Sequence, residues 1–209
     1  MAISYPLTFP TDLGVESFRV IPRVSAGRNE SPFSFAEQIY DWGGQILGIE
    51  ATMPKMNRET AEIFNAFLFS LNGRVGTFLM PIPGAGDALG VATGTPLVNG
   101  GSQTGNELDT DGWTPSQTNI LKAGTWLSLG SGSSTRLYKN LVDVDSNGSG
   151  EATLTLWPNL RSSPADNAAI DITNPHGLFR MDANVQPIDI TGPDFYSFSF
   201  KAWEALDGT

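Results

Sequence analysis

The chain has 209 residues, with 12 basic and 22 acidic side chains, a formal charge of −10 and no cysteine. The absence of cysteine excludes disulfides, thiolate metal sites and cysteine nucleophiles, and the acidic balance argues against a surface that binds nucleic acid. No run of 18 apolar residues occurs, and residues 1–14 lack the basic and apolar regions of a signal peptide, so we expect a soluble protein that is not exported by the usual route.

The first third of the chain predicts short strands. Residues 18–24 form a weak strand, which Pro22 places at a sheet edge. Apolar residues alternate over 32–42, where Phe33, Phe35 and Ile39 share one face, and again over 45–53. The pair Gly43-Gly44 between these stretches predicts a hairpin turn.

An amphipathic helix is predicted over 57–73, followed by a strand over 76–83. Asn57 is suited to the N-cap and Gly73 to the end of the helix. Apolar side chains recur at helical spacing and predict a face packed against a sheet, with an exposed anchor as the alternative. The members of this face are Ile63, Phe64, Phe67, Leu68 and Leu71.

The segment 84–118 is rich in Gly, Thr and Asn and predicts loops or short strands held by turns. It matches no P-loop pattern, and the Gly-Ala-Gly at 84–86 opens no helix. Strands resume at 119–130, where Gly124 suggests a bulge or sharp bend. They continue over 135–144, 151–157 and 168–173, which together fit a compact β-barrel.

The stretch "DVDSNGSGEATLTLWP" (143–158) begins like an EF-hand calcium loop. Position twelve of such a loop needs a bidentate carboxylate, but here it is Leu154, and Glu151 falls at position nine. The flanking residues also alternate as strands rather than helices. We therefore predict a hairpin turn, with an adventitious calcium site as the lesser alternative.

The C-terminal part predicts strands over 177–181, 185–190 and 195–206, with a frayed tail at 207–209. In the last strand Tyr196, Phe198, Phe200 and Ala202 share one face, which predicts a central position in the main sheet. The predicted fold class is mainly β: a β-sandwich with one amphipathic helix, plus an inserted small β-barrel.

Residues able to carry catalysis are few. His176, between Pro175 and Gly177, is the only histidine and is placed in a turn. A catalytic triad or a zinc site needs more partners than one histidine without cysteine supplies. Four carboxylates, Asp109, Asp111, Asp143 and Asp145, occupy turn-like segments, where aspartate is expected anyway. We predict no enzyme activity, no cofactor and no metal site.

The order of the motifs carries a resemblance. The segments "DWGGQILGIEATMPKMNRETAEIFNAFLFSLNGRVGTFLMPIP", "LKAGTWLSLG", "LYKNLVDVDSNGSGEATLTLWPNLR" and "NPHGLFRM" occur in that order over about residues 40–182. Each motif alone is degenerate. Together they resemble the distal tail proteins of tailed bacteriophages, specifically those of siphophages and related gene-transfer particles.

This resemblance implies a ring-forming belt domain and an outward-facing barrel of OB-like type. The belt would comprise residues 1–83 and 177–209, and the inserted barrel residues 84–176. Six copies would form a ring that joins the tail tube protein to the hub and other tail-tip proteins, with contacts along belt edges including 15–24 and 195–203. DNA would pass through the ring without being bound. The protein would reside in the virion tail, and in the host cytoplasm before assembly, with no membrane partner.

Three alternatives remain open. A sibling tail tube or hub protein would share the belt and differ in symmetry. A carbohydrate-binding module would recognise the host surface through Trp113 and Trp126, which requires exposed tryptophans. A virion-associated hydrolase would require two carboxylates about 5–9.5 Å apart in a cleft, from the 109–145 region. The negative charge suits simple solubility, or alternatively a lumen to which DNA does not stick.

Overall fold

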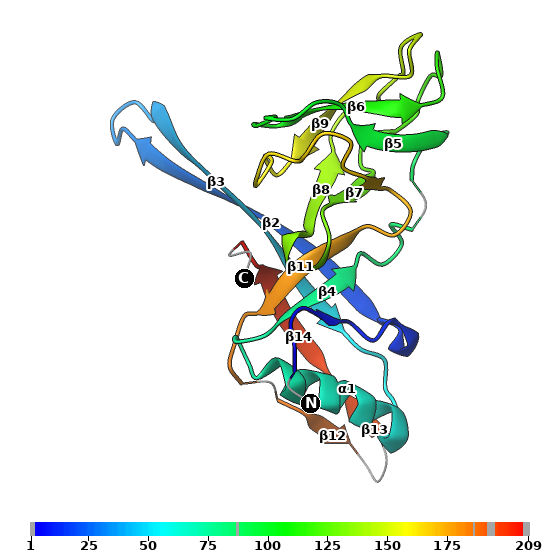
Figure 1. Ribbon diagram of the computed structural model, residues 1–209. Coiled ribbons are helices and arrows are strands. Elements are labelled where there is room, and N and C mark those ends of the chain that lie inside the picture. The colour runs from blue at the N-terminus through cyan, green and yellow to red at the C-terminus, as the bar shows by residue number, and fades with distance from the viewer. Residues whose placement is uncertain (1–2, 87, 186, 192–194, 207–209) are drawn as a thin grey trace.

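The computed structural model describes residues 3–86, 88–185, 187–191 and 195–206. In these residues the protein is mainly β with a single α-helix, as predicted, and its strands form two large sheets and one small one (Figure 1). The expected fraying of residues 207–209 lies outside the described part.

The first large sheet has the strand order β1-β4-β11-β14-β3-β2. Its strands are Leu7–Thr8 (β1), Ser17–Glu30 (β2), Glu37–Thr52 (β3), Thr77–Pro81 (β4), His176–Met181 (β11) and Ser199–Glu204 (β14). Strand β14 lies inside the sheet, as predicted, but the predicted strand over 195–206 is divided, because Phe195–Ser197 belongs to a separate small sheet. Strand β2 forms an edge of the sheet. Pro22, which has no backbone N–H, is tolerated there because the outer side of an edge strand has no neighbouring strand to hydrogen-bond.

One face of this sheet is covered by helix α1 (Arg58–Leu71), as Figure 1 shows. The Asn57 side chain accepts a hydrogen bond from the Thr60 backbone N–H at 2.9 Å, so the predicted N-cap is confirmed. Asn72 is left-handed at the C-cap, and Gly73 follows with φ +63°. Ile63 is exposed, contrary to the prediction, because it precedes the buried Phe64 by one residue and therefore points about 100° away around the helix.

Aromatic rings fill the space between the helix and the sheet. Phe64 of α1 meets Phe198 at a centroid distance of 5.0 Å and Phe9 at 5.9 Å, both edge to face. Phe200 of β14 and Phe78 of β4 complete the cluster. A two-stranded sheet, Asp189–Thr191 (β12) with Phe195–Ser197 (β13), lies beside α1. The helix therefore contributes a packed core, not an exposed anchor.

The second large sheet has the strand order β10-β7-β8-β9-β6-β5. Its strands are Gly94–Val98 (β5), Glu107–Trp113 (β6), Trp126–Leu129 (β7), Arg136–Asn140 (β8), Ala152–Trp157 (β9) and Ile170–Asp171 (β10). An isolated bridge between Leu97 and Ala169 joins the two ends of the sheet. The sheet thus closes almost completely into a barrel around its own apolar core.

The connection between β8 and β9 differs in part from the predicted tight hairpin. Strand β8 ends at Asn140, because Val144 turns into the barrel and bridges Leu121. The tight turn is confined to 147–150, where the Gly150 N–H donates to the Asn147 carbonyl at 3.1 Å. The bend at Gly124, with φ +96°, precedes β7 instead of interrupting it.

The barrel packs on the first sheet through a few specific contacts. Arg161, which follows β9, forms a two-pronged ion pair with Glu204 of β14, at 2.5 Å and 3.2 Å. The Asn159 backbone N–H donates to the Gln45 side chain at 2.7 Å. Leu137 of β8 is buried in the core of the first sheet.

Candidate functional site: the exposed hairpin arm

The most unusual feature of the molecule is a hairpin made of β2 and β3. The two strands pair antiparallel from Ser17 opposite Thr52 to Glu30 opposite Glu37, so the chain reverses at 31–36. The turn that was predicted at Gly43-Gly44 is therefore wrong. Those glycines lie within β3, at a shift in register opposite Ser25 and Ala26, where Gly43 has φ +70° and supports a bulge rather than a reversal.

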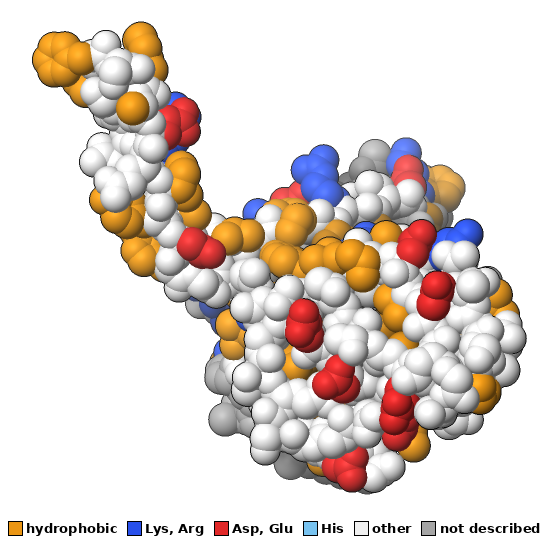
Figure 2. All heavy atoms as spheres, turned by 90° about the horizontal axis from the view of Figure 1, so that it is seen from above, with side chains coloured by type: hydrophobic (Ala, Val, Ile, Leu, Met, Phe, Trp, Pro, Cys, Tyr) orange, Lys and Arg blue, Asp and Glu red, His pale blue; other side chains and the backbone are white. Residues whose placement is uncertain are grey.

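More than half of this hairpin leaves the body of the protein. Strand β14 pairs with β3 only between Gly48 and Thr52, so residues 37–47 of β3 pair with β2 alone. Figures 1 and 2 show the ribbon projecting well beyond both large sheets. We call residues 23–45 the arm. Among the described residues, no third strand pairs with this part of β2 or β3.

The arm carries large apolar side chains on its exposed surface. At its tip Phe33 is 95 % exposed and Phe35 is 73 % exposed, and farther along Trp42 is 68 % exposed. Figure 2 shows hydrophobic side chains at the far end of the arm and along its length. The full set is Val24, Phe33, Phe35, Ile39, Tyr40 and Trp42.

These side chains make the isolated arm energetically incomplete. A two-stranded ribbon is marginally stable in water by itself. Each large apolar side chain gains roughly 1.5–3 kcal/mol when it is fully buried, so six of them offer on the order of 10 kcal/mol to a partner before the cost of association. An exposed apolar surface of this kind marks an interaction site.

The arm is nevertheless internally organised. The Arg28 guanidinium pairs with Glu30 and, at 2.7 Å, with Glu37 across the strands. The Trp42 ring covers Gly27 so closely that a Cβ added there would lie 2.5 Å from the ring. At the turn, the Phe35 N–H donates to the Ser31 carbonyl at 2.9 Å. These contacts order the backbone of the arm and the Trp42 ring.

Sequence reasoning missed the arm because it placed Phe33, Phe35 and Ile39 on one strand face and put the chain reversal at Gly43-Gly44 instead of at 31–36. The available signal was on the opposite face, where Tyr40 and Trp42 are also bulky. A strand that is apolar on both faces needs cover from both sides, and the part of the chain that the structure describes places no second layer over this strand.

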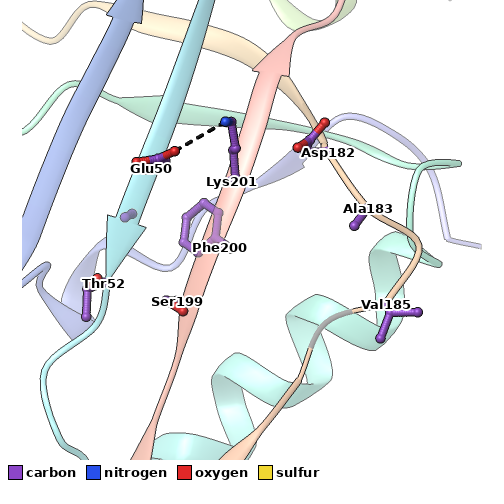
Figure 3. A pocket seen from close by; sticks show the side chains of 9 residues that line it. Glu50, Thr52, Asp182, Ala183, Val185, Ser199, Phe200 and Lys201 are labelled. Atoms are coloured by element: carbon purple, nitrogen blue, oxygen red, sulfur yellow. Dashed lines mark ion pairs between the residues drawn. The ribbon is translucent and has the colours of Figure 1, made fainter.

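A surface hollow of about 380 Å³ lies between β3, β14 and the segment after β11, and Figure 3 shows its lining. Lys201 pairs with Glu50 across it at 3.3 Å, and Glu50 also pairs with Arg19 at 3.0 Å. Asp182 accepts a hydrogen bond from the Trp203 indole at 3.1 Å. The charged groups of this hollow neutralise one another, an arrangement that holds strands together and prepares no nucleophile.

The candidate catalytic residues do not converge on a site. His176 begins β11, where its backbone N–H donates to the Ser128 hydroxyl. Asp143 and Asp145 accept hydrogen bonds from the backbone N–H groups of Ala123 and Asn119, at 2.8 and 2.6 Å, and so fasten the loop before β9.

A polar hollow of about 420 Å³ on the barrel contains three carboxylates, those of Asp109, Asp145 and Glu151. The Asp109 carboxylate accepts from the Thr153 hydroxyl at 2.6 Å, and that of Glu151 from the Asn147 amide at 2.8 Å. The described residues contain no group of three or more His, Cys, Asp or Glu arranged to hold a metal ion. These carboxylates stabilise loops.

The two tryptophans considered for glycan contact are not presented to solvent. Trp113 is buried, and its indole N–H donates to the Thr110 hydroxyl at 2.8 Å. Trp126 is half-buried against the core of the first sheet, with the Lys139 ammonium 4.6 Å from its ring centroid. Their burial counts against a sugar-stacking role.

The sequence matches no protein-family model and no curated protein. In the described part of the chain, no helix has the length and apolarity that a membrane span requires. The order of the sequence motifs and the exposed arm are therefore the features that bear on function.

Proposed function

We propose that this protein is a structural component of a bacteriophage tail tip, which assembles into a ring through its hairpin arm. The observation that carries the proposal is the arm itself, with six large apolar side chains that its own chain leaves uncovered. The motif order, which resembles that of distal tail proteins, supplies the setting. The ring would contain six copies, connect the tail tube to the hub and receptor-binding apparatus, and let DNA pass.

The geometry of the arm favours a ring over a symmetric pair. An arm that projects from one side of a subunit can contact a different surface on the next subunit, and such head-to-tail contacts form rings when the rotation between subunits closes. Strand β2 is an edge and has backbone groups free along 17–24. The other segment expected at a belt edge, 195–203, includes β14, which is paired on both sides by β11 and β3. Ring contacts should therefore involve β2 and the arm, and not β14.

The charge and the hollows are consistent with a passive role. The net charge of −10 would keep a DNA passage from binding the phosphate backbone. The hollows at Glu50 and at Asp109 hold carboxylates engaged in ion pairs or hydrogen bonds. Function would come from assembly.

The test is the mass of the purified protein by light scattering, with negative-stain imaging of the same sample. We expect closed rings for the natural sequence and a monomer for the double variant Phe33→Ser/Phe35→Ser, which alters only exposed side chains. Ile63→Ser with Phe69→Ser is the matched control, since it removes two exposed apolar groups from α1. Equal assembly by both variants would contradict the role of the arm.

Because the chain has no cysteine, contacts of the arm can also be mapped directly. A single cysteine replacing Phe33, carrying a photo-crosslinker, should form a ladder of covalent oligomers. A cysteine replacing Ser149, exposed on the barrel loop, should not. A natural protein that stays monomeric and forms no arm crosslinks, both alone and with the tail tube protein, would refute the proposal.

The alternative as a glycan-binding module is weaker, because Trp113 is buried and Trp126 is half-buried. The hydrolase alternative is also weaker, because the three carboxylates in the polar hollow on the barrel accept hydrogen bonds from the Thr153 hydroxyl, the Asn119 backbone N–H and the Asn147 amide.

A further inference from the structure

Two charged side chains are buried in the described part of the protein, Arg136 and Glu204. Glu204 is neutralised by the two-pronged contact with Arg161. Arg136, which is 8 % exposed, has no such counter-charge: no carboxylate of the described residues lies within 4.0 Å of its guanidinium. A largely buried arginine without a carboxylate beside it is unusual, and this asymmetry points to a missing partner.

The hydrogen bonds of Arg136 use one of the three guanidinium nitrogens and leave the other two available. Its Nη1 donates to the backbone carbonyls of Ser133 and Thr135, at 2.9 and 2.8 Å. Its Nε and Nη2 donate to nothing in the part of the chain that the structure describes. Nη1 therefore fixes the orientation of the planar group, while two of its nitrogens keep the paired donors that match an oxyanion.

These donors belong to a residue that lines a cavity of about 250 Å³ on the barrel, between the end of β7 and the segment 162–168. The cavity is smaller than a typical drug-sized site, which is about 300 Å³ or more, so it suits a single small group. Its polar lining includes the hydroxyl-bearing residues Ser134, Tyr138, Ser162 and Ser163.

Tyr138 adds a second donor. Burial raises the pKa of this phenol above 10.0, so it is protonated at neutral pH. Its oxygen accepts from the Arg161 N–H at 3.2 Å, and its own hydrogen remains to be donated. Arg136 and Tyr138 are two residues apart on β8 and therefore point to the same face of the strand.

We propose that this cavity binds a small oxyanion, a carboxylate or phosphate group, through Arg136. The anion would supply the charge that the fold omits. The site lies on the barrel and not on the arm, so binding can be tested independently of the proposed assembly.

The test is isothermal titration calorimetry on the full-length protein with inorganic phosphate and with acetate, at an ionic strength held constant with sodium chloride. We expect saturable binding of at least one probe. Stronger phosphate binding would assign a phosphoryl ligand, and stronger acetate binding would assign a carboxylate, such as that of an acidic side chain. Heats that saturate with neither probe would overturn the proposal.

Three variants locate the site. Arg136→Met should weaken binding by about tenfold or more, because it removes a charge-assisted hydrogen bond. Ala165→Trp, at the exposed rim, should block the cavity without touching Arg136 and decides the matter if Arg136→Met does not fold. Arg19→Met removes the same charge from an exposed surface pair and should leave binding unchanged. Unchanged affinity in Ala165→Trp would place the anion elsewhere and refute the assignment.

Discussion

The ion pair between Arg161 and Glu204 should hold the barrel against the first sheet, and Arg161→Met is the change that tests it. The Glu204 side chain is 2 % exposed, and that of Arg161 is 16 % exposed. Removing the arginine leaves a buried carboxylate with one remaining donor, the Leu47 N–H at a long 3.4 Å. Loss of one partner from a buried pair costs about 3–5 kcal/mol.

We expect the lower end of that range, about 3 kcal/mol, because the partial exposure of Arg161 indicates that water can approach the pair. Glu204→Leu should cost less, since the freed arginine can turn toward solvent. The double variant Arg161→Met/Glu204→Leu should be more stable than the sum of the two single changes predicts, because it leaves no unpaired charge.

The assay is urea denaturation of all four proteins, followed by fluorescence, with the coupling free energy taken from the cycle. Arg19→Met serves as a control for the surface pair with Glu50, where the side chains are 74 % and 35 % exposed and the expected cost is below about 1 kcal/mol. A cost for Arg161→Met no larger than that of the control, together with additive single changes, would refute the reasoning.

Three further predictions concern stability. Burial raises the Tyr138 pKa above 10.0, so the phenol loses its proton at lower pH in the unfolded state than in the folded state, and the free energy of unfolding should be insensitive to this residue below pH 10 and fall as pH rises above it. Between pH 8 and 11 the free energy of unfolding should fall less steeply in Tyr138→Phe, and an identical slope would contradict the argument. Gly48→Ala places a Cβ 2.7 Å from the Trp203 ring and should lower the free energy of unfolding by about 1–3 kcal/mol. Gly101→Ala, with open space around it, should lower it by under about 0.5 kcal/mol. Equal urea midpoints for the two variants would count against close packing of Gly48 on Trp203. Phe64→Ala removes a fully buried ring from the aromatic cluster and should cost about 3–5 kcal/mol, with exposed Phe69→Ala as its control in the same denaturation series.

Local patterns were sufficient for much of the fold. The N-cap at Asn57 follows from short-range chemistry and is confirmed. The central strand predicted over 195–206 is confirmed only for Ser199–Glu204, because Phe195–Ser197 pairs with β12 in the small sheet. The near-closure of the barrel follows from several short strands with a bend at Gly124. Ile63 was misassigned because a broad apolar stripe on a helix does not specify which flank meets the sheet.

The ionic features depend on contacts that no local pattern contains. Arg161 and Glu204 are 43 residues apart in sequence and meet only because the barrel packs on the first sheet. The isolation of Arg136 likewise depends on where every acidic side chain of the fold ends up. Neither the Arg161–Glu204 ion pair nor the cavity at Arg136 could be predicted before the barrel and the first sheet were placed together.

The arm shows a different limit of sequence reasoning, and one that bears on function. Alternation correctly predicted an extended chain over 37–42, but it also placed Phe33 and Phe35 on that strand, and these two residues lie in the turn at 31–36. A period-2 pattern predicts that one face of a strand is buried, but it does not indicate whether the same chain or another molecule buries it. Ile39, Tyr40 and Trp42 lie on β3 and are exposed on both of its faces. Their exposure is the observation on which the proposed contact with another subunit rests.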